Sequence, residues 1–121
     1  MIEPAKVTPL PPNKIRITAI IREIASDSAR WSINVPAEDW QAIRHLVNKR
    51  QVERCLLDGF VIEDHAWLDE HDNWRCSVGR VCGGVFVGIE VAVRRSPALP
   101  KLFVIAIKGE QIGSEDIGGE P

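Results

Sequence analysis

Residues 74–94 read WRCSVGRVCGGVFVGIEVAVR, two runs of alternating side chains on either side of Gly83-Gly84. Alternation with a period of two is typical of strands with one buried face. Two adjacent glycines supply the positive φ angles of a tight hairpin turn. The sequence therefore predicts a β-hairpin of strands 74–81 and 85–94. With both glycines at the centre of the turn, the expected register pairs Cys82 with Val85, Val78 with Ile89, Ser77 with Glu90, and Arg75 with Ala92.

The two faces of this predicted hairpin differ in chemistry. One face is expected to be the core face and carries Trp74, Cys76, Val78, Ile89, Val91 and Val93. The opposite face combines small side chains with a few charges, among them Arg75, Glu90 and Arg94. Side chains on alternate positions of a strand point to opposite sides of the sheet. The mixed face is thus the candidate for a functional surface.

Two further strands are expected beside the hairpin, over residues 60–67 and 102–108, because turn-forming residues bound both segments. Residues 102–107 are apolar at every position. This pattern predicts an inner strand that is covered on both sides. The complete expectation is a four-stranded antiparallel sheet.

The chain before the sheet is expected to be helical. Isoleucines with helical spacing predict a first helix over residues 13–27: Ile17, Ile20, Ile21 and Ile24. A short extended piece, residues 31–35, follows. Pro36 can begin a second helix, whose buried stripe is Trp40, Ile43, Leu46 and Val47. A second apolar set, Val52, Cys55 and Leu56, ends at Gly59, where glycine can take a positive φ. The predicted fold class is α+β, with two to three N-terminal helices on the sheet.

Both ends of the chain have unusual compositions. Residues 1–12 contain four of the eight prolines and are expected to be a flexible lead. Residues 109–121 contain four glycines, four acids and two isoleucines, too little apolar surface to offset the ordering entropy. We expect a disordered acidic tail that either aids solubility or covers a basic surface. Residues 13–108 are expected to form a single domain.

Composition and charge exclude several classes of protein. The 121 residues are 45% hydrophobic and 26% charged, close to the average globular domain. No apolar run approaches the roughly 18 residues of a membrane span, and the first residues do not resemble a signal peptide. We therefore expect a cytoplasmic protein with three reduced cysteines and no membrane contact. The net charge of −2 argues against a constitutive nucleic-acid binder. However, residues 73–108 carry six basic side chains and one acid.

Neither a metal site nor a cysteine nucleophile is expected. Zinc could in principle use His65, His71, Cys76 and Cys82. The spacing contains no close ligand pair, and the predicted register places Cys76 on the core face. A catalytic cysteine needs an exposed thiolate beside a base, and nothing in the spacing supplies one. The sequence predicts no metal and no cofactor.

Cleavage of RNA is a chemistry that needs no metal. The 2′-hydroxyl group can act as the nucleophile while side chains transfer protons and cations stabilise the phosphate. Arg75 and Arg94 lie beside Glu90 on the mixed face, and Arg44 and Lys49 would flank them if the second helix packs alongside. The alternative is that Glu90 and its arginines form an ordinary cross-strand ion pair.

Several segments resemble a family of small bacterial domains of unassigned function. They are IREIASDSARWSI (21–33), VERCLLDG (52–59), LDEHDNWRCSVGR (68–80) and the Gly83-Gly84 turn with the strand after it. The most specific part is Asn73-Trp74-Arg75-Cys76, where members typically have Asn-Trp-Lys-Cys after an acidic turn with a histidine, like Asp69-Glu70-His71. Members look distantly related to RelE/ParE-type toxins, which are metal-independent ribonucleases or inactive relatives of them. The resemblance covers about residues 15–108 and implies a RelE-like α+β fold.

The chain departs from this family at the second helix. Members usually begin it with a His-Ala pair, an Arg-Met pair and another arginine. This chain has PAEDWQA at 36–42, and His45 falls near the position of the next arginine. The resemblance and the mixed face together suggest two sets of residues. The catalytic candidates are His45, His71 and Arg75, and the RNA-binding candidates are Arg44, Lys49, Arg75 and Arg94.

Two functions remain open from the sequence. The first is a RelE-like ribonuclease or RNA-binding domain of a toxin–antitoxin system, active or degenerate, with RNA and an antitoxin as partners. The second is a non-catalytic module that binds another protein through the mixed face or a strand edge. A small-molecule enzyme is the weakest alternative, because the sequence contains no nucleotide-binding loop, metal set or triad.

Overall fold

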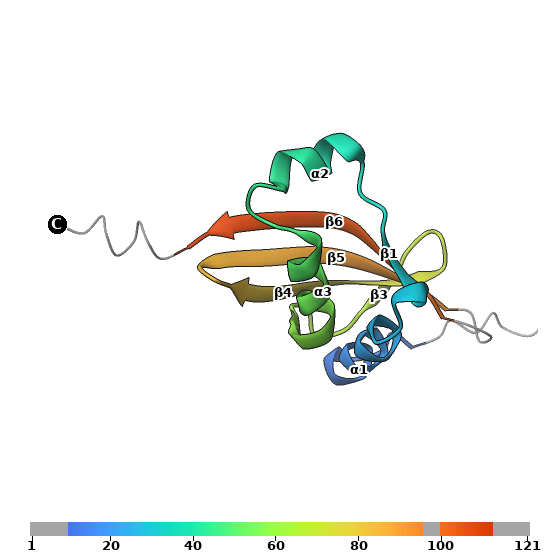
Figure 1. Cartoon of the computed structure of the whole chain (residues 1–121). Helices are drawn as coiled ribbons and strands as arrows, with labels where there is room; N and C mark the ends of the chain where they lie inside the picture. Colours follow the sequence, from blue (N-terminus) through green and yellow to red (C-terminus); the bar gives the residue numbers. More distant parts are fainter. Residues whose placement is uncertain (1–9, 96–99, 113–121) are drawn as a thin grey trace, which may run out of the picture.

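The computed structural model describes residues 10–95 and 100–112. These residues form an α+β fold with three α-helices and one mixed six-stranded sheet (Figure 1). The helices are α1 (Lys14–Ala25), α2 (Ala37–Ile43) and α3 (Lys49–Asp58), and a short 3-10 helix, η1 (Ser28–Arg30), follows α1. The strands are β1 (Trp31–Ile33), β2 (Phe60–Val61), β3 (Trp67–Leu68), β4 (Asn73–Cys82), β5 (Val85–Arg94) and β6 (Leu102–Gln111).

The sheet differs from the predicted antiparallel four-stranded one. Its strand order is β1-β6-β5-β4-β2, β3 also pairs with β4, and β1 runs parallel to β6. The expected strand at 60–67 is divided into β2 and β3. Between them, the Ser77 N–H donates to the side chain of Glu63 at 2.7 Å instead of to a backbone carbonyl. A side-chain acceptor therefore replaces part of the expected ladder.

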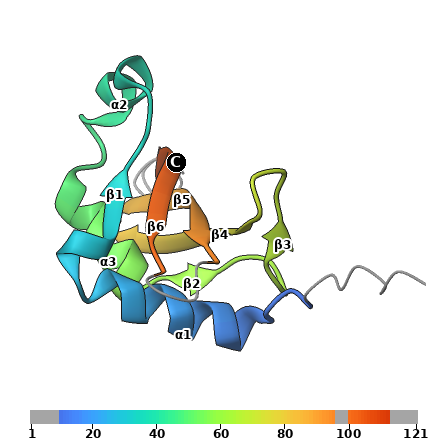
Figure 2. The same cartoon turned by 90° about the vertical axis from the view of Figure 1, so that its right-hand side faces the viewer.

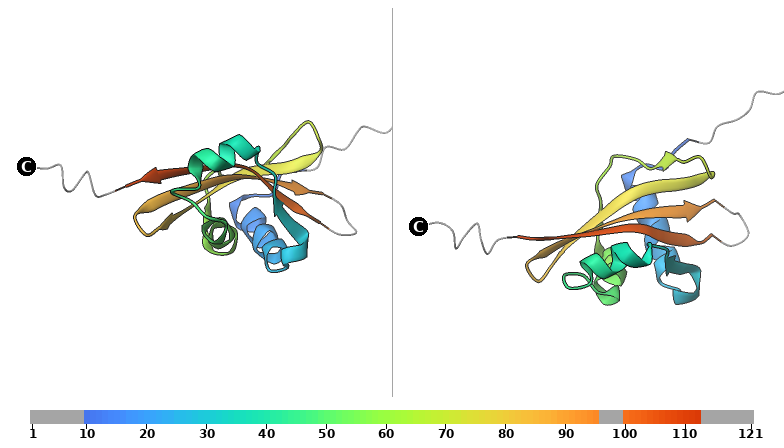
Figure 3. Two further views of the ribbon diagram at one scale, coloured as in Figure 1. Left: turned by 45° about the horizontal axis from the view of Figure 1, so that its top comes forward. Right: turned by 90° about the horizontal axis from the view of Figure 1, so that it is seen from above.

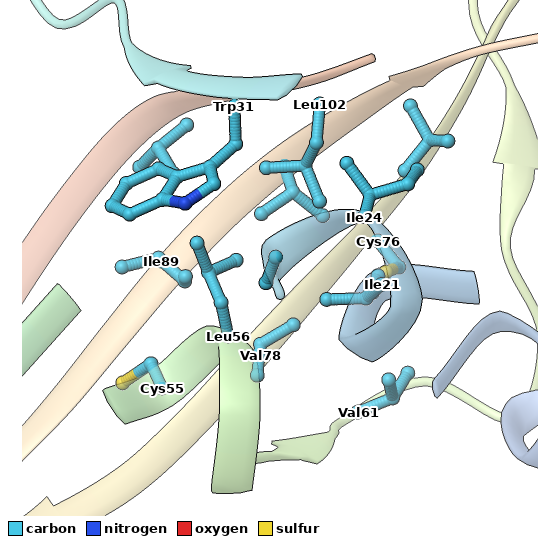
Figure 4. Close-up of a cluster of buried hydrophobic side chains, with 14 of the residues drawn as sticks. Ile21, Ile24, Trp31, Cys55, Leu56, Val61, Cys76, Val78, Ile89 and Leu102 are labelled. Atoms are coloured by element: carbon cyan, nitrogen blue, oxygen red, sulfur yellow. The ribbon is translucent and has the colours of Figure 1, made fainter. Parts of the chain in front are cut away.

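The central hairpin confirms the prediction from the two glycines. Gly83 and Gly84 have φ angles of 58° and 82°, and β4 and β5 pair in the predicted register along their whole length. The predicted core face is buried against helices α1 and α3. Figure 4 shows part of this cluster, including Ile21 and Ile24 of α1, Leu56 of α3, and Val78 and Ile89 of the hairpin.

All three helices lie on one side of the sheet (Figures 2 and 3). The other side carries no helix, and β3 with its flanking loops stands at its border. The prediction that residues 102–107 are covered on both sides is therefore wrong. Leu102 and Val104 are buried, but Ala106 is exposed and Ile105 half-buried. β6 is an inner strand between β5 and β1, with helices over one face only.

The structure confirms the predicted first helix as α1 and divides the helical region after it into α2 and α3. Asn13 caps α1 by accepting from the N–H of Arg16 at 2.9 Å. The second helix ends at Ile43, and α3 starts anew at Lys49 because Asn48 and Gln51 form a reciprocal capping box. Gly59 ends α3 as predicted, but its φ of −76° is not left-handed. A Cβ there would lie 2.4 Å from the carbonyl oxygen of Cys55, so close packing requires the glycine.

The structure shortens both predicted terminal segments. β6 continues to Gln111, so Gly109–Gln111 belong to the sheet and not to a disordered tail. Pro12 is buried, and its carbonyl accepts from the N–H of Ala66 at 3.0 Å, so the end of the predicted lead is packed. Residues 1–9 and 113–121 of these two segments lie outside the described residues. Within the described part, no helix is both long and apolar enough to cross a membrane.

Candidate binding surface on the free face of the sheet

The side of the sheet without helices is called the free face here. Strands β4, β5 and β6 contribute its side chains, and the loops around β3 form one border (Figure 2). The register places on it Arg75, Ser77, Gly79 and Val81 of β4, Phe86, Gly88, Glu90 and Ala92 of β5, and Phe103 and Lys108 of β6. This is the mixed face that the sequence predicts.

Arg75 lies on the free face between two carboxylates, close to the loop that leads into β4. Its Nη1 donates to Oε2 of Glu90 at 3.2 Å, and its Nε lies 3.3 Å from Oδ2 of Asp69. The side chain of Arg75 is 23% exposed and that of Asp69 only 7%. Two carboxylates therefore neutralise the positive charge of Arg75, and most of its side chain is shielded from solvent.

Asp69 also organises the loop between β3 and β4. Its Oδ1 accepts from the backbone N–H groups of His71 at 2.8 Å and Asn73 at 2.9 Å. Asp72 in the same loop has a φ of 66°, a left-handed conformation that aspartate tolerates better than most residues. The loop presents the imidazole of His71 at the border of the free face.

Two hollows lie on this face. One, of about 340 Å³, is lined by Asp69, His71, Asn73 and Arg75 together with Asn34 and Phe103. The other, of about 360 Å³, has Gly88, Ser77 and Ala106 among its small lining residues and Ile62 and Lys108 among its larger ones. Small side chains at neighbouring sheet positions leave room that the larger residues enclose. Both hollows are open to solvent and adjoin along β5, through Glu90 and Ala92.

Exposed apolar side chains surround the hairpin end of the free face. Phe60 is 54% exposed, Ile62 47% and Val81 53%. The ring of Phe86 covers Gly79, where a Cβ would lie 2.6 Å from it, and its centroid is 6.5 Å from that of Phe60. Because apolar groups of this size normally avoid water, clustered exposure is typical of an interaction surface.

The structure brings together only some of the predicted site residues. His71 and Arg75 line the same hollow, and the guanidinium of Arg94 lies 5.4 Å from the ring centroid of Phe103 on the same face. Lys49 instead lies on the helix side, with its Nζ 5.9 Å from the ring centroid of Trp31. Arg44 and His45 directly follow α2, which is also on the helix side (Figure 3), and neither lines a hollow of the free face. The second helix therefore does not pack beside Arg75, which was the condition for Arg44 and Lys49 to flank it.

Two of the three cysteines, Cys55 and Cys76, are unsuited to act as nucleophiles. Burial raises the pKa of Cys55 and of Cys76 to about 12, so both remain thiols at neutral pH. Cys82 is half-buried at the hairpin end, where Nη1 of Arg80 lies 3.1 Å from its sulfur. In the described parts of the chain, no cluster of three or more histidine, cysteine, aspartate or glutamate side chains could hold a metal ion.

Asp69, Glu63 and the apolar cluster were not among the predicted site residues. In the sequence, Asp69 stands out only as part of the acidic turn of the family resemblance, and Glu63 carries no signal of its own. A further signal for Asp69 was present, because aspartate often accepts from backbone N–H groups a few residues later in a turn. No comparable signal exists for Phe60 and Ile62, because their segment reads as an ordinary strand.

Comparisons of the chain with protein-family models, with curated proteins and with solved structures find no match.

Proposed function

We propose that this protein is a non-catalytic interaction module that binds another protein through the free face. The observation that carries the proposal is the exposed apolar cluster of Phe60, Ile62 and Val81 beside a hollow of about 360 Å³. Removal of apolar surface from water is the main favourable contribution to protein association. A rim of charged residues around an apolar centre is the usual arrangement of such surfaces.

The electrostatics of the free face also favour a protein partner. Arg75 is paired with Asp69 and Glu90, and the backbone of Ser77 holds the carboxylate of Glu63 close by. A polyanion such as RNA binds mainly through unpaired cations that displace counterions. A surface on which carboxylates compensate Arg75 suits a protein partner with charges of both signs.

A site-specific photo-crosslink tests this proposal in the native host of the protein. A benzophenone amino acid replaces Ile62 on the free face or, as a control, Ile15 on α1, which is 80% exposed. We expect a discrete protein adduct from position 62 that is lost when Val81→Ser and Phe60→Ser are added. Equal adduct patterns from the two positions, or none from position 62, would contradict the proposal.

A ribonuclease or RNA-binding function, as in RelE/ParE-type toxins, is the second candidate. The specific observation in its favour is that His71 and Arg75 line one hollow with Asn34, Asn73 and Phe103. Amides and an aromatic ring can bind an unstacked base, and an imidazole beside an arginine can transfer a proton to or from a phosphate ester. His45 has no place in this arrangement.

Incubation with a mixed RNA pool at low and moderate salt tests the second candidate. If it is correct, the protein cleaves the RNA or binds it, and the binding weakens from low to moderate salt. Arg75→Ala and His71→Ala should each abolish the cleavage or the binding. Arg54→Ala serves as the control, because Arg54 is exposed on α3 and pairs only with Asp58. Intact, unbound RNA at every protein concentration excludes this candidate and leaves the protein-binding proposal standing.

A further inference from the structure

A groove of about 1070 Å³ lies on the helix side of the sheet, between β1, α2 and α3. Figure 1 shows the three elements around it: β1 leads into α2, and α2 is followed by the segment that leads down to α3. The groove is separate from the free face, which lies on the other side of the sheet (Figure 3). Its volume is slightly above the range of about 300–1000 Å³ that small-molecule sites occupy, so a small ligand has room in it.

The walls of the groove are mainly apolar and include two indole rings. Trp31 of β1 is 9% exposed and belongs to the hydrophobic core, whereas Trp40 of α2 is half-buried. Ile33 and Val35 extend the apolar wall along and beyond β1. None of the α2 residues is fully buried, so α2 covers the groove without filling it. Flat aromatic surfaces that partly face a cavity favour flat ligands that can stack on them.

One end of the groove is positively charged. Lys49 and Arg50, the first two residues of α3, line it and are exposed, and neither forms an ion pair with another described residue. The Nζ of Lys49 lies 5.9 Å from the ring centroid of Trp31, which places the charge directly beside the apolar wall. Glu53, one turn further along α3, is the single carboxylate among the lining residues. The cations therefore exceed the anions at this end.

We propose that this groove binds a small aromatic anion, with its ring system against Trp31 and Trp40 and its acidic group against Lys49 and Arg50. The proposal combines an apolar cavity of ligand size with unpaired cations at one end. An arginine and a lysine can together hold a carboxylate, sulfonate or phosphate group through charge-assisted hydrogen bonds. This site is independent of the proposed protein-binding free face.

Two fluorescent probes that differ by one charge test the proposal. Anilinonaphthalene sulfonate has the aromatic body and an anionic group, and the uncharged parent anilinonaphthalene has the same rings without it. We expect the sulfonate to bind about fivefold or more tightly than the neutral probe, since a charge-assisted contact of about 1 kcal/mol gives that ratio. Equal affinities would overturn the proposal.

Variants and tryptophan signals locate the binding site. The double variant Lys49→Gln and Arg50→Gln should remove the preference for the sulfonate, and Trp40→Ala should weaken both probes, whereas Arg54→Gln, outside the groove on the same helix, should change neither. In NMR spectra the sulfonate should shift the indole N–H signals of Trp31 and Trp40. Shifts confined to Trp67 and Trp74, or a preference that survives the double variant, would contradict the assignment.

Discussion

Asp69 makes two hydrogen bonds and one ion pair at the border of the free face. One of its oxygens accepts from two backbone N–H groups, and the other pairs with Arg75, with the side chain 7% exposed. We expect Asp69→Ala to lower the free energy of unfolding by about 2–3 kcal/mol, because the variant leaves Arg75 with one partner fewer and two donors without an acceptor. Urea titration measures this. Glu70→Ala is the matched control, because Glu70 is exposed and makes no side-chain hydrogen bond or ion pair with the described residues. A loss as large in the control would contradict this role for Asp69.

The two buried thiols should make the protein less stable in alkali. Burial raises the pKa of Cys55 and Cys76 from 9.0 to about 12. Below pH 9 both thiols keep their protons in the folded and unfolded states. Between pH 9 and 12 the thiols lose their protons only in the unfolded chain. The free energy of unfolding therefore falls by about 1 kcal/mol per pH unit for each thiol.

Urea unfolding at several alkaline pH values checks this expectation, since other groups also titrate there and only a comparison isolates the thiols. The Cys76→Ala variant should show a shallower fall in stability above pH 9 than the wild-type protein. Cys82→Ala is the control, because Cys82 is half-buried at the hairpin end. An unchanged slope in Cys76→Ala would contradict the role of the buried thiol.

At the level of single residues, the sequence was informative where a partner lies on the neighbouring strand of the hairpin, even when the pair is diagonal. The Arg75–Glu90 pair follows from the register that Gly83-Gly84 imposes. The Arg75–Asp69 pair does not, because it depends on a loop in which Asp72 takes a positive φ. Gly59 was identified as the end of α3, but only part of the crowding that requires it is local to the helix, at Cys55. The rest comes from Val78 and Gly79 of β4, which the sequence does not place beside Gly59.

Among the elements, α2 is the most weakly attached. It has no fully buried residue, whereas α1 buries Ile17, Ile21 and Ile24, and α3 buries Val52, Cys55 and Leu56. Elements with few buried contacts open without global unfolding. We expect the amides of α2 to exchange with solvent deuterium at least about tenfold faster than those of α3. Hydrogen exchange followed by NMR measures both helices in one sample, and equal protection would contradict this view of α2.

Two features of the elements were not predicted: β1, because its partner is distant, and the break before α3, because the apolar stripe of the second helix outweighed a local capping signal. β1 was expected only as a short extended piece, because three residues cannot reveal a parallel partner about 70 positions away. The second helix was expected to continue toward Lys49 because its apolar stripe includes Leu46 and Val47. The capping box of Asn48 and Gln51 starts a new helix instead. The hairpin and α1 were predictable because their signals are local.

For the whole molecule, one hydrophobic cluster joins both layers. It contains residues of α1, β1, α3, β2, β4, β5 and β6, so none of these elements retains its full set of contacts without the others. The sequence predicted the core face of the sheet and the mixed face opposite to it. It did not predict that β6 is uncovered on the mixed face, because the apolar run in β6 indicated cover on both faces. The free face, and with it the candidate site, exists because the three helices all pack on the same side.

This shared core should make unfolding a single cooperative transition for everything except α2. Circular dichroism reports the helices and strands, and fluorescence reports mainly the core tryptophans Trp31 and Trp74. Both signals should change at the same urea concentration, as for a two-state domain.

Ile24→Ala removes a fully buried side chain between α1 and the sheet. Both unfolding midpoints should move down together, and the free energy of unfolding should fall by about 2–5 kcal/mol. Ile15→Ala truncates the same residue type on the same helix, where it is 80% exposed, and should change stability by less than about 0.5 kcal/mol. If only the helical signal moved in Ile24→Ala while the tryptophan signal stayed, α1 would unfold separately, and the two layers would not share one core.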